Sequence, residues 1–484
     1  MRCLTLACEL MRRGAQVCFV SRNLPGYLRE MALQEKCEVR LLTSVLEKLP
    51  PGGLMHEHWL GTSQQTDAVE TTSLLSDGIW DWMIVDHYAL DVNWEKTVRK
   101  ATPKIMVIDD IADRVHDCDV LLDQNFYVGM EKRYSGRVPL YCQLLMGPRY
   151  GLLREEFREL RGSVEQRKGP VKRMLIFFGG VDSDDYTARA INAVAGIGCH
   201  DLHVDVVIGA QHPHIAQIRS LCAANAYSCH VQTPLMADLI ASADLAIGAG
   251  GSATWERCCL GLPSFTICVA DNQQELIRNA ASAGLIYSPD VSGDLTAHMS
   301  RHVVALMENG YLRHFISANS MSAVDGRGAA RVAGCLEHGE IQIRSARQDD
   351  SRALFEWRNH PSVRAGSRDS EVIPWEIHER WFAAVMNSPD RLLLLGHQGV
   401  VPLGVVRFDI QGLEAEVSIY RVPGGSQLGR GRDLLQSAEQ WLFVNRPDVF
   451  AVRAHILGSN DQSRRLFTEA GYQIESSSYL KKVN

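Results

Sequence analysis

The chain has 484 residues, of which 46% are hydrophobic and 22% are charged, a globular composition that excludes a disordered, collagenous or disulfide-stapled chain. Its length suggests two to four domains. Because 50 Lys and Arg residues face 57 Asp and Glu residues, the net charge is −7, which argues against a nucleic acid or an anionic membrane held by bulk charge.

The 13 cysteines indicate a reduced, cytoplasmic chain, because their number is odd and no two of them form a C-x-x-C pair. We expect no metal site. No segment approaches the ~18 apolar residues of a membrane span, so we expect no membrane partner. The last cysteine is Cys335, and this abrupt change in composition predicts a separate module shortly after it.

The first part of the chain alternates helical and strand patterns, which is typical of a parallel α/β sheet. Apolar residues at helical spacing run from Leu4 to Met11, and strands are predicted at 16–20, 79–87 and 104–110. A helix normally follows a strand in such a sheet, but here the chain begins on the helix. We therefore expect one strand and one loop to be missing from the N-terminus, within a Rossmann-like unit 1–157.

A polar stretch at 158–173 is predicted as a linker. Strands at 173–180, 203–210 and 243–251 then predict a second Rossmann-like unit, 158–338. After Gly339 the strands lie closer together, at 341–346, 391–397, 403–410 and 415–420, with a helix at 354–360. This pattern predicts an independent α+β domain, 339–484.

The segment LAIGAGGSATWERCCLGLP (245–263) carries the most chemistry of the first part. A strand runs into Gly248, Gly250 and Gly251, and a helix begins near Ser252. Glycines let a ligand approach the backbone, and free N–H groups at a helix start attract phosphate. A plain strand–helix turn explains the glycines equally well, since the motif is weak.

Five segments together resemble the UDP-sugar hydrolases of pseudaminic acid biosynthesis, namely 85–95, 107–125, 147–157, 177–185 and 248–263 with the following Asn-Gln pair. The resemblance covers nearly all of residues 1–338 and implies a GT-B-like pair of Rossmann units. It implies that Gly250, Gly251 and Ser252 receive the diphosphate of a UDP-sugar, that Glu256 holds the ribose, and that Asn272 and Gln273 contact the nucleotide sugar.

The family usually opens with a strand and a G-x-G-H-x-M-R-C loop, whereas this chain begins at Met1-Arg2-Cys3. The histidine of that loop is the family's base, so we expect the hydrolase base to be absent from this chain. Either the start is assigned too late or the hydrolase is truncated. His87 or Asp86 is a substitute base, although a structural role for both is favoured.

Three other candidates are weaker. His56-x-His58 and His212-x-His214 lack an acidic or cysteine partner at a ligand spacing. The pair Asp109-Asp110 is a possible catalytic dyad, but a strand-end pair that caps the next helix is favoured.

The segment 415–442 predicts a strand, a glycine-rich turn and an amphipathic helix, and 460–472 predicts a second helix. Gly429 and Gly431 lie at the first helix start, where N–H groups can hold a pyrophosphate and Arg430 and Arg432 add positive charge.

Together these two segments resemble the GNAT acetyltransferases, with Ser426 as a mild departure from the family's loop. The resemblance implies an acetyl-CoA site made by Leu428, Gly429, Arg430, Gly431, Arg432 and Asn460. Glu416 is a candidate base. Many members have an acidic Tyr where this chain has Phe467, which leaves Tyr472 as the fallback acid.

The triplet at 357–359 and the segment 377–382 resemble the branch that acetylates the 4-amino group of a UDP-amino-sugar, with Arg358 and Asn359 as substrate-binding candidates. The sequence thus predicts a bifunctional enzyme, an N-terminal hydrolase fused to a GNAT N-acetyltransferase. The alternatives are a GT-B glycosyltransferase fused to a protein N-acetyltransferase, or a nucleotide-sugar-binding pseudo-hydrolase attached to an active acetyltransferase. The sequence does not determine the oligomeric state.

Overall fold

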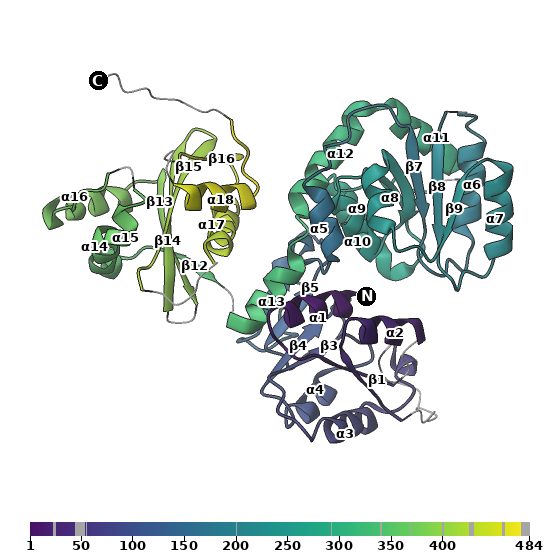
Figure 1. Ribbon diagram of the computed structural model, residues 1–484, viewed down its shortest axis with the longest axis horizontal. Helices are drawn as coiled ribbons and strands as arrows, with labels where there is room; N and C mark the ends of the chain where they lie inside the picture. The colour runs from purple at the N-terminus through teal and green to yellow at the C-terminus, as the bar shows by residue number, and fades with distance from the viewer. Residues whose placement is uncertain are drawn as a thin grey trace. The chain divides into compact units, whose positions relative to one another are not determined.

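The computed structural model describes residues 1–22, 26–43, 54, 56–199, 201–291, 293–338, 341–367, 369–398, 401–424, 430–456 and 460–475. The chain divides into two compact units, Met1–Ala333 and Gly334–Asn484 (Figure 1), and each is described by itself. The predicted domain limits at 157/158 and 338/339 stay predictions.

The described residues of the first unit form three parallel sheets. Its strands are β1 (Cys18–Ser21), β2 (Glu38–Leu41), β3 (Trp82–Val85), β4 (Lys104–Ile108), β5 (Val120–Asp123), β6 (Gln143–Met146), β7 (Arg173–Phe177), β8 (His203–Ile208), β9 (Ser228–Val231), β10 (Leu245–Ala249) and β11 (Ser264–Ile267). Its α-helices are α1 (Arg2–Arg12), α2 (Gly26–Gln34), α3 (Gln64–Leu74), α4 (Val92–Val98), α5 (Glu155–Arg161), α6 (Tyr186–Ala195), α7 (Ile215–Ala224), α8 (Met236–Ser242), α9 (Ser252–Cys259), α10 (Gln274–Ser282), α11 (Leu295–Glu308), α12 (Gly310–Ala323) and α13 (Gly328–His338), the last of which leads into the second unit.

The first half of this unit is split between two of the sheets. Helix α1 opens the chain, as the apolar spacing predicts, and Gly14 follows its end with a φ of 93°, a left-handed conformation that suits glycine. Among the described residues, β1 pairs only with β2, and β3 pairs only with β4 in the sheet β3-β4-β5-β6. The strand expected ahead of α1 stays a prediction.

The second half is one five-stranded parallel sheet in the order β11-β10-β7-β8-β9. From β7 the chain moves outward through β8 and β9 and then returns to the other side of β7 as β10. Ligands of open α/β sheets bind beyond the carboxyl ends of the strands at such a reversal. The turns after β7 and β10 are therefore the place to look for a site.

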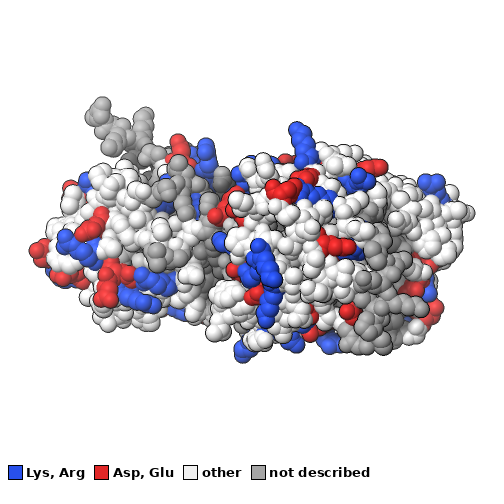
Figure 2. Space-filling model, turned by 90° about the horizontal axis from the view of Figure 1, so that it is seen from below, with Lys and Arg blue, Asp and Glu red and all other residues white. Residues whose placement is uncertain are grey.

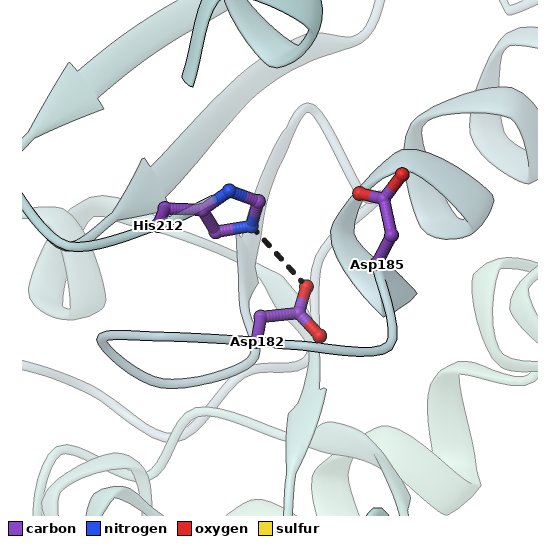
Figure 3. Close-up of side chains that lie close together, drawn as sticks. All are labelled: Asp182, Asp185 and His212. Carbon is purple, nitrogen blue, oxygen red and sulfur yellow. Dashed lines mark ion pairs between the residues drawn. The ribbon is translucent and has the colours of Figure 1, made fainter. Parts of the chain in front are cut away.

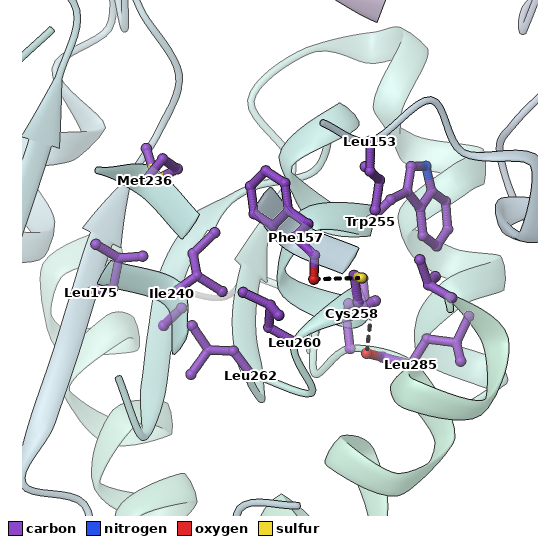
Figure 4. Packing of buried hydrophobic residues seen from close by; sticks show 14 of the residues in the cluster. Leu153, Phe157, Leu175, Met236, Ile240, Trp255, Cys258, Leu260, Leu262 and Leu285 are labelled. Atoms are coloured by element: carbon purple, nitrogen blue, oxygen red, sulfur yellow. Dashed lines mark hydrogen bonds between the residues drawn. The ribbon is translucent and has the colours of Figure 1, made fainter. Parts of the chain in front are cut away.

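A buried apolar cluster fixes helix α9 directly after β10 (Figure 4). Trp255, Cys258 and Leu260 pack there against Phe157 of α5 and Leu285. Each of these side chains is at most 5% exposed. This packing therefore holds the start of α9 in a fixed position.

The two halves of the first unit are joined by packing as well as by sequence. A Cβ on Gly328, at the start of α13, would lie 2.2 Å from the carbonyl oxygen of Gly151, so only glycine fits at this approach. Arg331 Nη1 donates to the carbonyl of Arg149 over 2.7 Å. The predicted linker 158–173 is wrong at its beginning, because helix α5, anchored by the buried Phe157, extends to Arg161.

The second unit is an α+β fold around one sheet in the order β12-β13-β14-β15-β16. All neighbours are antiparallel except β15 and β16, which are parallel. Its elements are β12 (Gln342–Ser345), α14 (Ser351–Asn359), α15 (Pro361–Arg364), α16 (Trp375–Met386), β13 (Arg391–Gln398), β14 (Val401–Gln411), β15 (Glu414–Arg421), α17 (Gly431–Asn445), β16 (Ala451–Ala454) and α18 (Asp461–Glu469).

Two surface properties bear on partners. None of the described helices is long and apolar enough to cross a membrane. On the face drawn in Figure 2, basic and acidic side chains are interspersed rather than gathered by sign.

Candidate functional site

The glycines of the turn after β10 serve different purposes. A Cβ on Gly248 would lie 2.3 Å from the carbonyl oxygen of Phe177 in β7, and one on Gly250 would lie 2.4 Å from Ile277 in α10. These two positions are glycine because protein atoms pack against them. A Cβ on Gly251 would meet nothing within 4 Å. The space that the sequence assigns to a ligand is therefore beside Gly251.

Helix α9 begins at this open position with free amide groups. Gly251 is its N-cap residue; its N–H donates to Thr254 Oγ1 over 3.3 Å, and the N–H of Thr254 donates to its carbonyl over 2.9 Å. The N–H groups of Ser252 and Ala253, in the first turn, have no acceptor inside the helix. This arrangement suits an anion, since the positive end of the helix dipole lies at the same place.

Glu256 lies one turn into α9. Its side chain is partly buried, and no described residue donates a hydrogen bond to its carboxylate. Burial raises the pKa of Glu256 to about 7, against the opposing charges of Arg154 and Arg257. An unpartnered carboxylate beside an anion-binding turn can accept hydrogen bonds from a diol, as the resemblance implies.

The predicted amide pair after β11 lies in a short 3-10 helix, Asp271–Gln273. Gln273 Oε1 accepts the N–H of Val269 over 3.3 Å, so this amide supports its own loop. The backbone of Asn272 is described, but its side chain lies outside the described part. Contact of either residue with a sugar nucleotide stays a prediction.

The first half contributes a charged cluster where β3 and β4 end. Arg2 forms ion pairs with Asp86 (2.6 Å) and Asp110 (3.1 Å), and Cys3 Sγ donates to Asp86 over 3.0 Å. Burial acts to raise the pKa of Asp86, but the hydrogen bond and charge of Arg2 outweigh it and the pKa is lowered. Asp86 is therefore a weak base.

His87, the other substitute base, is also poorly prepared. Its Nδ1 accepts the N–H of Ala89 over 3.1 Å, which leaves the proton of the neutral ring on Nε2. Burial lowers the pKa of His87. Neither ring nitrogen is then free to take a proton from water.

The Asp109-Asp110 pair has two separate environments. Asp109 is fully buried; it accepts the N–H of Ala112 over 2.9 Å and pairs with Arg114 over 3.0 Å. Asp110 accepts the hydroxyl of Tyr88 and pairs with Arg2. These partners favour the structural interpretation over a catalytic dyad.

Contacts across the first unit connect this cluster to the turn at Gly251. Arg133 Nη2 donates to the carbonyl of Asp110 over 3.1 Å, and its Nη1 pairs with Glu275 in α10 over 3.0 Å. Trp255 Nε1 in α9 donates to Asn125 Oδ1 over 3.0 Å. The segment after β5 therefore lies against α9, which carries Glu256, and against α10.

A carboxylate–histidine cluster joins the loops after β7 and β8 (Figure 3). Oxygens of Asp182 and Asp185 and a nitrogen of His212 all lie within 4.8 Å of one another. The prediction that His212 lacks an acidic partner is wrong, because the fold brings Asp182 and Asp185 beside it from a different loop.

The hydrogen bonding of His212 does not suit a cation. Its Nδ1 accepts the N–H of His214 over 3.1 Å, so Nε2 carries the proton and faces Asp182 Oδ2 at 3.6 Å. A metal-bound imidazole instead presents a lone pair to the metal and donates through its other nitrogen. Asp182 already accepts the N–H groups of Tyr186 and Thr187 at the start of α6. The absence of a metal from the function stays a prediction.

The other histidine pair has aromatic neighbours instead of acids. The ring of His56 lies 4.6 Å from that of Trp59 and 5.5 Å from that of Tyr88, and the ring of His58 lies 6.0 Å from that of Trp59. Among the described residues, neither belongs to a group that offers three metal ligands.

In the second unit, the predicted acetyl-CoA loop is described only at its end. Ser426, Leu428 and Gly429 lie outside the described residues. Gly431 begins α17 after its N-cap residue Arg430, and Arg432 follows in the first turn. Arg430 Nη1 donates to Gln398 Oε1 over 3.4 Å, so this arginine is held at the helix start.

Asn460 uses both ends of its amide within the protein. Its Oδ1 accepts the N–H of Ser463 over 3.0 Å at the start of α18, and its Nδ2 donates to the carbonyl of Gly366 over 3.3 Å. A pantetheine contact would have to replace or share one of these bonds, and it stays a prediction.

The two proton-transfer candidates of the second unit differ in their surroundings. Glu416 lies on β15, 3.8 Å from His455 Nε2. Tyr472 is partly buried, and its hydroxyl donates to Glu439. Burial, and next the charge of Glu439, raise the pKa of Tyr472, and its hydroxyl proton is already donated to Glu439, so it is not available to a leaving thiolate.

The two substrate-binding candidates also separate. Asn359 Nδ2 donates to the carbonyl of Ile373 over 3.0 Å, and its Oδ1 accepts the N–H of the same residue over 2.8 Å. It therefore fixes a loop. Arg358 donates through Nη2 to the carbonyl of Asp369, whereas its buried Nη1 has no hydrogen-bond partner among the described residues.

Sequence reasoning missed Tyr420 on β15. It is partly buried, and among the described residues no side chain or backbone group bonds to its hydroxyl. Burial raises the pKa of Tyr420, and the charges of Arg358 and Arg407 act in the opposite direction. The sequence pattern around Tyr420 is that of an ordinary strand, so it did not indicate that the hydroxyl would be partly buried and near two arginines.

The strand orders define the class of fold, as predicted: parallel α/β sheets in the first unit, followed by an α+β second unit. No family model matches the chain. Over 217 residues, or 44% of this chain and 76% of the relative, the chain is 24% identical to the UDP-2,4-diacetamido-2,4,6-trideoxy-beta-L-altropyranose hydrolase of Campylobacter jejuni.

Two solved structures are each similar to part of the chain. MurG of Acinetobacter baumannii is 13% identical with a TM-score of 0.47, covering 70% of this chain and 95% of its own. The N-acetyltransferase PseH of Campylobacter jejuni is 18% identical with a TM-score of 0.23, covering 28% of this chain and 91% of its own.

Proposed function

We propose that the first unit binds a UDP-sugar and hydrolyses it to UDP and the free sugar, and that the second unit N-acetylates a UDP-amino-sugar with acetyl-CoA. The observation that carries the first half is the turn at Gly251. It combines open space, free N–H groups and the unpartnered carboxylate of Glu256. The named relative, a UDP-diacetamido-sugar hydrolase, supports the choice of nucleotide and sugar class.

Each group at this turn has a role in such a complex. The N–H groups of Ser252 and Ala253 bind the diphosphate, and Glu256 accepts hydrogen bonds from the ribose hydroxyls. In hydrolysis, water attacks the anomeric carbon, the bond from that carbon to the phosphate oxygen breaks, UDP leaves as an anion, and the proton lost by the attacking water passes to solvent. The donors at Gly251–Ala253 stabilise the charge that develops on the leaving diphosphate.

The acetyl transfer has its own bond changes. The substrate amine adds to the thioester carbonyl, the C–S bond breaks, and the amine proton goes to a base such as Glu416. The thiolate of CoA takes up a proton as it leaves. The start of α17 at Gly431 offers N–H groups to the pyrophosphate of acetyl-CoA, and Arg358 has a buried N–H available for the substrate.

The test follows both products separately. The full chain is incubated with acetyl-CoA and a UDP-4-amino-sugar, while CoA release is read with a thiol reagent and UDP release by chromatography. We expect CoA first and UDP afterwards. Omitting acetyl-CoA and supplying the diacetamido sugar nucleotide should give UDP alone. If neither product forms, the proposed function is wrong.

A second candidate is a nucleotide-sugar-binding unit that does not hydrolyse. It is favoured by the state of the two substitute bases, since His87 Nδ1 accepts the Ala89 N–H and Asp86 is paired with Arg2. CoA release without UDP release, together with measurable UDP binding, would select this candidate.

A further inference from the structure

Arg257, the residue after Glu256 in α9, is a buried cation for which the described residues supply no counter-ion. Its side chain is 2% exposed, and among the described residues no carboxylate forms an ion pair with it. Its Nη2 donates to the carbonyl of Ala249 over 2.9 Å and to Thr254 Oγ1 over 3.3 Å, while its buried Nε has no hydrogen-bond partner in the described part of the chain. Arginine is almost never buried to this extent unless it is paired.

The position of this charge makes the lack of a counter-ion more costly. The guanidinium reaches back to the N-terminal turn of α9, where the helix dipole is itself positive. The neighbouring Glu256 does not pair with it, because successive helical side chains diverge by about 100°. Two positive sources therefore act on the turn at Gly250–Ala253.

A second buried arginine of the same unit shows how such a charge is otherwise compensated. Arg313 is 3% exposed and also lacks a carboxylate partner among the described residues. It donates to the carbonyls of Leu306 and Met307, at the negative C-terminal end of α11, and to the carbonyl of Gly169. Arg257 has no comparable negative helix end.

The bond to Ala249 also orients the turn. In a trans peptide the C=O and N–H groups point in opposite directions, so drawing the carbonyl of Ala249 toward Arg257 turns the N–H of Gly250 away from it. The arginine thus fixes the turn by its hydrogen bond to the carbonyl of Ala249, while its charge attracts an anion to the opposite side of the turn, toward which the N–H of Gly250 points.

We propose that Arg257 is a positioning residue whose buried charge holds the phosphate groups of a nucleoside diphosphate at the Gly251–Ala253 turn. This inference rests on the proposed nucleotide-binding function. It extends that function by assigning the missing counter-ion of Arg257 to the ligand's phosphates.

The test compares UDP with uridine, which has the same base and ribose but no phosphate, by calorimetry on the full chain. Arg257→Met should weaken UDP binding at least tenfold and leave uridine binding within twofold of wild type. Arg257→Lys, which keeps the charge, should bind UDP within threefold. The matched control Arg313→Met should leave both affinities unchanged wherever it folds, and if Arg257→Met does not fold, the comparison of Arg257→Lys with Arg257→Gln replaces it.

Equal losses of UDP and uridine affinity would show that Arg257 only supports the fold, and an unchanged UDP affinity would remove it from binding altogether; either result overturns the inference while the proposed function stands. Failure of the wild-type chain to bind UDP would overturn both. A UDP-specific loss supports both.

Discussion

Replacing Glu256 with glutamine tests the nucleotide turn through its pH dependence. The pKa of this carboxyl is raised from 4.5 to about 7 by burial, so the folded state holds the proton more tightly than the unfolded state does. Below pH 4.5 the carboxyl is neutral in both the folded and the unfolded state and does not lower the free energy of unfolding. As the pH rises through 7, the folded protein loses the stability that the bound proton gives it. Glutamine stays neutral throughout and avoids this loss.

The shift sets an upper bound on the effect. Two and a half pKa units correspond to about 3 kcal/mol, and the partial exposure of the side chain reduces this to roughly 1–2 kcal/mol. Glu256→Gln should match wild type at pH 4.5 and unfold later than wild type at pH 8. Urea unfolding of the first unit, followed by tryptophan fluorescence, measures both differences.

The variant Glu256→Gln should also bind uridine more weakly than the wild-type protein does. A hydrogen bond to a charged group contributes about 1.5–3 kcal/mol, so Glu256→Gln should weaken uridine binding at pH 8 by about tenfold or more. Uridine is the better probe, because phosphate groups titrate near pH 6. Equal stability of the two proteins at pH 8 would refute the burial argument, and unchanged uridine affinity would refute the ribose role.

Three further predictions use the same kind of contrast. Gly251→Val should change the free energy of unfolding by no more than about 0.5 kcal/mol and weaken UDP binding at least tenfold. Gly250→Ala, whose Cβ would meet Ile277 at 2.4 Å, should instead destabilise the protein by about 1–3 kcal/mol. Thermal unfolding measures the stabilities and calorimetry the affinities, and the same result for both variants would contradict the assignment of the ligand space to Gly251. Asn359→Ala should lower the stability of the second unit by about 1–2 kcal/mol without changing acetyl-CoA affinity, and unchanged unfolding would show that its two backbone bonds contribute little. Tyr420→Phe should leave stability within about 0.5 kcal/mol and slow acetyl transfer at least tenfold, and full activity would exclude the phenol from the reaction.

The turn from β10 to α9 was predictable from sequence because it depends on local patterns. A run of apolar residues, closely spaced glycines and a helix start are all properties of neighbouring positions. The purpose of each glycine was not predictable in this way. Gly250 is constrained by Ile277 of α10, a contact that depends on how two helices pack.

The same limit explains the side chains that the structure assigns differently. His212 was judged by residues close to it in sequence, but its acidic neighbours arrive from the loop after β7. Asn359 and Tyr472 have the polar groups that a substrate site needs, and the fold uses those groups internally. A motif identifies which residues are capable of a contact, and only packing decides which contact they make.

Glu256 and Arg257 show how the fold can store binding energy. The two residues are adjacent, oppositely charged and short of partners, yet the helix directs them away from each other. Burial shifts both toward the neutral form, raising the pKa of Glu256 to about 7 and lowering that of Arg257 to about 10. A nucleoside diphosphate carries hydroxyl donors for Glu256 and negative charge for Arg257, so one ligand would offset the cost of burying both groups. The affinity of this turn would then come as much from costs already present in the empty protein as from new contacts, and the first unit should gain more thermal stability from UDP than from uridine.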